Sequence, residues 1–273
     1  MWDEERERVL WVDINAGHVH SGSLEGDIIT LGGQLSFDQT VGAVACSEDG
    51  QLLVAAQRDL YRVRRDSRPE VLASIIPADR QSRLNDGACD PAGRFLVGSL
   101  SLGAREREEC LYQFGQDGSV AIVDDDLTLS NGLAWSPDGS VLYSVDTTPG
   151  VVWQRPYDVA TGSAGARSAV VRLGDGSPDG LCVDTAGNLW VAIWGAGEVR
   201  CYSPAGDRLA TVTVPAPHTS SVAFVGSARD ILLITTARDG LSSVQLDVFP
   251  LSGHLFIAHV DATGVPTTPW KAP

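Results

Sequence analysis

The sequence predicts an all-β protein, a six-bladed β-propeller with four-stranded blades around a central channel. Three observations predict this class: short β-rich runs recur at a near-constant spacing, a polar turn precedes most runs, and almost no segment has the 3.6-residue apolar period of a helix. Six units of this length without intervening helices match the blades of a propeller. A pair of β-sandwiches is the alternative, but it does not explain the near-constant period.

The six runs begin 42, 43, 47, 47 and 43 residues apart. In order they are VLWVDI (9–14), QLLVAA (51–56), RFLVGS (94–99), VLYSVD (141–146), NLWVAI (188–193) and ILLITT (231–236). Hairpin-type turns precede the first five, namely DEER, SEDG, DPAG, SPDG and DTAG. A second strand-like piece follows four of the runs: GHVHSG (17–22), DLYRVRR (59–65), VVWQRPYD (151–158) and EVRCYSP (198–204). We therefore expect one propeller domain over residues 1–273.

Composition limits the partners of the protein. The formal net charge of −15 argues against nucleic acid and anionic membranes, which require basic patches. No apolar run approaches the ~20 residues of a membrane span, and the N-terminus lacks the layout of a signal peptide, so we expect a cytoplasmic protein. The five scattered cysteines fit no disulfide framework or zinc site. The sequence is compatible with a monomer or a homodimer.

Counting back from the turn glycines identifies a polar position that repeats from blade to blade. Eight residues before the closing glycine stand Gly42, Asn85, Asn131 and Asp179 in blades two to five, and matching Phe224 to Trp135 places Ser220 there in blade six. These residues are expected to form a ring at the mouth of the channel. Amide and carboxylate oxygens are hard ligands, so the ring suits one divalent metal ion: Ca²⁺, Mg²⁺, Mn²⁺ or a water-bearing Zn²⁺.

A turn is the competing interpretation of each motif, because Asn-Gly and Asp-Gly are common turn dipeptides. The two SPDG sequences separate the interpretations. In the repeat register, residues 136–139 fall on a hairpin turn, whereas residues 177–180 fall at the channel mouth. Asp138 is therefore expected to be a turn residue and Asp179 a site residue.

Several of these stretches together resemble the senescence marker protein (regucalcin)/gluconolactonase family: RLNDGACDPAGRFLVGSL, LSNGLAWSPDGSVLYSVDT, PDGLCVDTAGNLWVAIWGAGEVRCYSPAGD and TTARDG. The resemblance spans essentially the whole chain. It implies a six-bladed propeller that holds one divalent metal ion, and an enzyme that hydrolyses a sugar lactone. It implies that Asn131 and Asp179 are metal ligands, that Asp179 is also the acid/base residue, and that Arg83 and Asn85 contact the substrate. For Arg83, a surface salt bridge is the alternative.

The chain departs from the family pattern in two places. The loop SLGAREREECLYQF (101–114) offers Glu106, Glu108 and Glu109 for a substrate-binding glutamate and assigns none of them. Aligning Trp2 with Trp135 places the ring position of blade one three residues upstream of Met1, where the family carries a third metal ligand. We therefore expect a metal site short of one carboxylate and a weaker seam between blades six and one.

The leading hypothesis is a metal-dependent sugar-lactone hydrolase. The alternatives are a non-catalytic or weakly active propeller that binds a metal or small molecule, and an enzyme for another ester or lactone. Two further features stay open. His18 and His20 share one strand face, and they form either a metal-binding pair or part of a half-exposed surface. Trp194 and His218 either border the site or have a structural role only.

Overall fold

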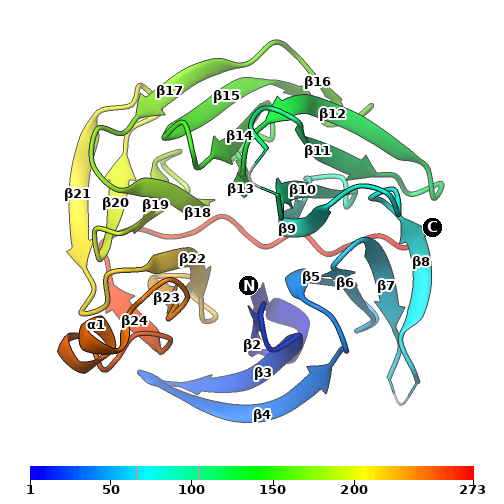
Figure 1. Cartoon of the computed structure of the whole chain (residues 1–273). Helices are drawn as coiled ribbons and strands as arrows, with labels where there is room; N and C mark the ends of the chain where they lie inside the picture. Colours follow the sequence, from blue (N-terminus) through cyan, green and yellow to red (C-terminus); the bar gives the residue numbers. More distant parts are fainter. Residues whose placement is uncertain (66, 104) are drawn as a thin grey trace. The chain divides into compact units, whose positions relative to one another are not determined.

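The computed structural model describes residues 1–65, 67–103 and 105–273, and its strands form six antiparallel sheets (Figure 1). Within each sheet, hydrogen-bonded neighbours follow one another in chain order, apart from a branch in the fourth sheet. The fold is a six-bladed β-propeller, which confirms the predicted class. The described residues divide into two compact units: residues 1–131, 157–164 and 267–273 form the first, and residues 132–156 and 165–266 form the second.

The first unit contains three complete sheets, each made of two consecutive hairpins. The first sheet holds β1 (Trp2–Asp3), β2 (Arg8–Asp13), β3 (His18–Glu25) and β4 (Ile28–Ser36), with the 3₁₀ turn η1 (Glu4–Arg6) between β1 and β2. The second holds β5 (Val41–Cys46), β6 (Leu52–Ala56), β7 (Asp59–Val63) and β8 (Glu70–Ser74). The third holds β9 (Ser82–Cys89), β10 (Phe95–Ser101), β11 (Glu109–Phe114) and β12 (Val120–Leu127).

The second unit contains most of the fourth sheet and all of the last two. The fourth sheet holds β13 (Ser130–Trp135), β14 (Val141–Asp146), β15 (Val151–Asp158), β16 (Ser163–Ala164) and β17 (Ser168–Arg172). The fifth holds β18 (Ser177–Val183), β19 (Leu189–Trp194), β20 (Glu198–Tyr202) and β21 (Arg208–Thr213). The sixth holds β22 (Thr219–Val225), β23 (Ile231–Thr236) and β24 (Leu255–His259), with the helix α1 (Ser243–Val248) in the connection between β23 and β24.

The six predicted runs are confirmed as strands β2, β6, β10, β14, β19 and β23, and the second strand-like pieces as β3, β7, β15 and β20. The predicted turns are confirmed as well. Their closing glycines, Gly50, Gly93, Gly139 and Gly187, have φ between +75° and +91°, a left-handed conformation that only glycine adopts without strain. The amide of each one donates to the carbonyl oxygen three residues earlier. Local turn chemistry therefore sets the hairpin register that the repeat predicted.

The first unit has an apolar core between its second and third sheets. Buried side chains from both sheets meet there, among them Leu53, Leu84 and Phe95, and the cluster includes Trp270 from the C-terminal segment. The Trp270 amide donates to the Cys46 carbonyl oxygen at 2.8 Å, and the Lys271 amide donates to that of Gly93 at 3.0 Å. The last residues of the chain thus complete the core of two sheets from its first half.

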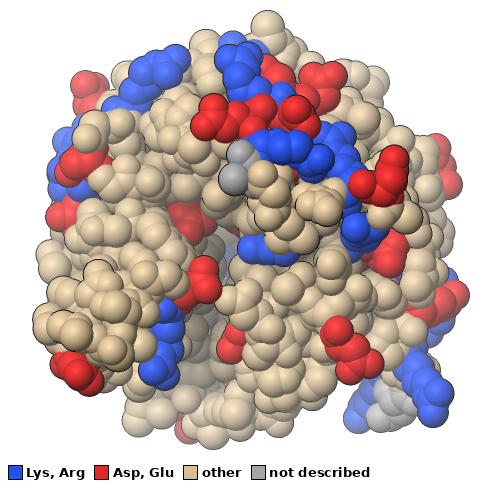
Figure 2. Space-filling model, in the orientation of Figure 1, with Lys and Arg blue, Asp and Glu red and all other residues tan. Residues whose placement is uncertain are grey.

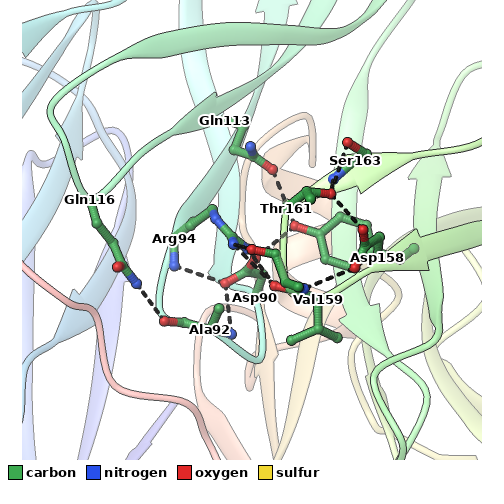
Figure 3. A network of polar contacts seen from close by, with 11 residues as sticks. Asp90, Ala92, Arg94, Gln113, Gln116, Asp158, Val159, Thr161 and Ser163 are labelled. Atoms are coloured by element: carbon green, nitrogen blue, oxygen red, sulfur yellow. Dashed lines mark hydrogen bonds and ion pairs between the residues drawn. The ribbon is translucent and has the colours of Figure 1, made fainter.

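A buried carboxylate organises the turn between β9 and β10 in the first unit (Figure 3). Asp90 accepts hydrogen bonds from the backbone amides of Ala92 and Arg94, from the Arg94 guanidinium and, at 2.7 Å, from the Tyr157 hydroxyl. The guanidinium of Arg94 also donates to the carbonyl oxygens of Val159 and Ala160. This network joins the turn at 157–164 to the third sheet.

Surface charge is mixed on the viewed face, where acidic and basic side chains lie beside one another near the upper edge (Figure 2). No helix within the described ranges is long and apolar enough to cross a membrane.

Candidate functional site

Four of the five predicted ring residues, all except Asn131, lie where the first strand of a sheet departs from regular pairing. In the ladders of four sheets, the register shifts by one residue at this place, which leaves residues of the first strand without a regular partner. The residues left over are Gly42 in β5, Asn85 and Asp86 in β9, Asp179 and Gly180 in β18, and Ser220 in β22. Such β-bulges re-aim side chains and are common beside active sites. The repeat-equivalent position is thus a structural feature as well as a sequence pattern.

In the first unit, Arg83, Asn85 and Asn131 form one hydrogen-bonded series. The Asn85 Nδ2 group donates to Asn131 Oδ1 at 2.7 Å and to the Ser130 carbonyl oxygen at 2.9 Å. The Arg83 guanidinium donates to Asn85 Oδ1 at 2.8 Å and to the Leu84 carbonyl oxygen at 3.0 Å. Both amide side chains are buried. Because each Asn85 amide atom has a partner of the matching kind, its orientation is determined. The structure therefore brings together three of the four predicted site residues.

In the second unit, Asp179 is half-buried near the start of β18. Its backbone is closely approached on one side by Gly132, the residue that follows Asn131 in the chain, since a Cβ atom there would lie 2.6 Å from the Asp179 carbonyl oxygen. On the other side, a Cβ atom on Gly180 would lie 2.2 Å from Ser221 Oγ. Glycines thus let the neighbouring first strands approach at the ring position.

Asp86 was not singled out from the sequence, although it lies in the same bulge as Asn85. Burial of its carboxyl raises the pKa to about 6, and the hydrogen bond from the Gly87 amide, 2.8 Å long, opposes this effect. A carboxyl group with such a pKa exchanges protons near neutral pH. The NDG motif signals a turn by composition alone and gives no sign of this desolvation.

Of the three glutamates that the sequence left open, Glu106 and Glu108 lie in the loop after β10 and Glu109 begins β11; Ala104 of this loop lies outside the described residues. Glu109 is fully buried and accepts hydrogen bonds from Ser82 Oγ at 2.8 Å and Ser99 Oγ at 2.6 Å. Glu106 is exposed, and Glu108 is exposed and paired with Arg105 at 3.4 Å. Glu109 therefore links strands of the third sheet. The choice of a substrate-binding glutamate stays a prediction.

The donor set of the predicted metal site consists of oxygen atoms. No group of three or more His, Cys, Asp or Glu side chains that could hold a metal occurs in the part of the chain that the structure describes. The predicted ligands are instead one buried amide oxygen, of Asn131, and one carboxylate, of Asp179. Oxygen donors of this kind fit a hard cation that retains water ligands.

Three of the five histidines take part in aromatic contacts, at two places. His20 stacks on Trp11 with ring centroids 5.4 Å apart, and His18 meets His20 edge to face at 5.6 Å. Burial, followed by the nearby His18, lowers the pKa of His20. Both residues are half-buried on β3, so the pair lies on a strand, as predicted. In the second unit, His218 stacks on Trp194 at 4.1 Å with an interplanar angle of 18°.

Comparison with known proteins gives the context of this geometry. Residues 1–238 match the model of the SMP-30/Gluconolactonase/LRE-like region. The chain is 32% identical over 281 residues to regucalcin of Bos taurus, covering 99% of this chain and 93% of that protein. It is 31% identical over 269 residues to the 6-deoxy-6-sulfogluconolactonase of Pseudomonas putida, covering 97% and 91%.

A solved structure is also similar over the whole chain. It is a calcium-binding protein, regucalcin, from Agrobacterium tumefaciens, with a TM-score of 0.93 and 25% identity, covering 100% of this chain and 92% of that one. With the match over residues 1–238 and the near-complete coverage by relatives, the chain belongs to the SMP-30/gluconolactonase/LRE-like family.

Proposed function

We propose that the protein is a lactonase that opens a sugar lactone with the help of one divalent metal ion. Membership of the SMP-30/gluconolactonase/LRE-like family carries the proposal, and relatives named as lactonases support the substrate class. The hydrogen-bonded series of Arg83, Asn85 and Asn131 supports a built site, since two buried amides on the first strands of two sheets are oriented by these hydrogen bonds.

Asn131 and Asp179 would hold the metal ion, through an amide oxygen and a carboxylate oxygen. Bound there, a divalent ion supplies Lewis acidity toward a carbonyl oxygen and lowers the pKa of bound water. Asp179 would accept a proton from the water that attacks the lactone carbonyl carbon. It would then return that proton to the ring oxygen as the bond between this oxygen and the carbonyl carbon breaks. The product is the open hydroxy acid.

Arg83 and Asn85 would contact the substrate. The hydrogen bonds from Arg83 to Asn85 Oδ1 and to the Leu84 carbonyl oxygen hold its guanidinium in place before the substrate arrives. Donors that are already oriented stabilise developing negative charge without a cost of reorganisation. A guanidinium carries five N–H donors in a fixed fork, and donors of this kind suit lactone oxygens or sugar hydroxyl groups.

Proton release from glucono-1,5-lactone tests the proposal. It is measured with Ca²⁺, Mn²⁺, Mg²⁺ or Zn²⁺ and again in chelator, for the wild type and Asp179→Asn. We expect turnover with metal, a large loss in chelator, and a loss of at least about 100-fold in Asp179→Asn, the size of a general acid–base contribution.

Asp138→Asn is the matched control, because it changes the aspartate of the other SPDG sequence. Asp138 is exposed and accepts hydrogen bonds from the Ser136 and Ser140 hydroxyls, as a turn residue does. This variant is expected to keep its activity. Equal activity of Asp179→Asn and wild type would refute the assigned role. Calorimetric metal binding without turnover of any lactone would favour a non-catalytic protein.

A further inference from the structure

The bulges allow first strands of different sheets to be aligned residue by residue. In β9 the bulge follows Leu84, and in β22 it follows Thr219; both residues are completely buried. One residue earlier stand Arg83 in the third sheet and His218 in the sixth, and both are half-buried. His218 therefore occupies the place in its sheet that Arg83 occupies in the third.

The hydrogen bonding of His218 determines which ring nitrogen carries the proton. Its Nδ1 atom lies 2.9 Å from the Asp239 carbonyl oxygen, which accepts hydrogen bonds and cannot donate them. Nδ1 therefore bears the hydrogen, and in the neutral ring Nε2 keeps its lone pair. The Asp239 carbonyl oxygen thus occupies the Nδ1 atom and leaves Nε2 as the acceptor of the neutral ring.

Trp194 fixes the plane of this imidazole. The two rings are nearly parallel, and their residues form an antiparallel bridge. Trp194 also pairs with Ser177, two residues before Asp179. On the next first strand of the same unit, the neighbour of Ser220, Ser221, touches Gly180. His218 and Asp179 therefore lie near the adjoining ends of neighbouring strands β22 and β18, and both are on the side where the bulges occur.

We propose that His218 is a substrate-contact residue whose Nε2 accepts a hydrogen bond from a hydroxyl group of the lactone, with Trp194 as the positioning residue for its ring. The inference rests on the proposed lactonase function and specifies its substrate class. A hydrogen-bond acceptor at this place selects polyhydroxylated lactones over lactones of plain alkyl chains.

The test compares two six-membered lactones that differ in hydroxyl groups, glucono-1,5-lactone and δ-valerolactone. In His218→Ala we expect kcat/KM for gluconolactone to fall about tenfold, mainly through KM, because one neutral hydrogen bond is lost. The kcat/KM for δ-valerolactone should change by less than about twofold, since this substrate has no hydroxyl group that could donate to His218. His218→Gln, which retains an acceptor, should recover part of the loss. Trp194→Phe keeps an aromatic face and should resemble wild type, whereas Trp194→Ala should resemble His218→Ala.

The outcomes separate the inference from the function on which it rests. If His218→Ala lowers kcat/KM equally for both lactones, or for neither, the inference is overturned and the lactonase function stands. If the wild type hydrolyses neither lactone with any metal, the proposed function fails. A binding measurement then decides the inference: quenching of tryptophan fluorescence by D-gluconate that persists unchanged in His218→Ala would overturn it.

Discussion

Replacing Asp86 with asparagine removes a carboxyl group that the fold desolvates in the bulge of β9. Burial raises its pKa from 3.8 to about 6. At 1.36 kcal/mol per pKa unit, this difference of about 2 units corresponds to at most about 3 kcal/mol. Because Asp86 keeps part of its surface accessible, we expect about 1–3 kcal/mol. Asparagine retains an oxygen that can accept the hydrogen bond from the Gly87 amide, so the substitution measures the effect of the charge alone.

The sign follows from proton binding. Between about pH 4 and pH 6 the native carboxyl group binds a proton that the unfolded chain has already lost, so wild-type stability falls as the pH rises through this window. Below pH 4 both states are protonated and this contribution to stability is fully present. Above pH 6 it is lost. Asp86→Asn should therefore match the wild type near pH 4 and exceed it in unfolding free energy near pH 7.

Urea denaturation followed by tryptophan fluorescence measures this difference at half-unit steps from pH 4.5 to pH 7.5, in chelator so that bound metal does not contribute. Asp117→Asn is the control, because Asp117 is exposed and the hydroxyl group of Ser119 lowers its pKa. That variant should show no gain at neutral pH. A difference between Asp86→Asn and wild type that stays constant across the range would refute the reasoning.

Two further substitutions test the packing of the first unit. Tyr157→Phe removes the 2.7 Å hydrogen bond to buried Asp90 and should cost about 1.5–3 kcal/mol, read as a lower melting temperature; an unchanged melting temperature would contradict the network in Figure 3. Gly42→Ala would place a Cβ atom 2.2 Å from the Asn85 carbonyl oxygen, which is a backbone atom and can yield only by a shift of its strand. It should cost about 1–3 kcal/mol in urea denaturation and lower kcat/KM by displacing Asn85, whereas full stability and activity would show that the two strands separate freely.

The repeat made the strands predictable because each sheet is built from hairpins whose signals are local. Turn glycines such as Gly139 and apolar alternation stand within a few residues of the strands that they specify. The same register marked Asn85, Asn131 and Asp179 as equivalent before any geometry was known. Their role as ligands and acid/base residue stays a prediction.

Features that depend on distant neighbours could not be predicted from local patterns. Glu109 is buried and accepts a hydrogen bond from Ser82, which lies on another strand of the sheet, and its residue type alone suggested a site residue. The desolvation of Asp86 arises from its surroundings in the folded sheet. The helix Ser243–Val248 is too short to show a helical period, although its capping box at Ser242 and Gln245 is a local signal.

The position of Trp270 has a consequence for the order in which the protein folds. Its side chain belongs to a core whose other members lie in the second and third sheets, so this contact closes a loop that contains most of the chain. Contacts between such distant residues carry a high entropic cost and form late. We therefore expect the hairpins to form first, while the core between these two sheets stays incomplete until the C-terminal segment docks. Docking of this segment would be the last and slow step of folding, and it would complete the core.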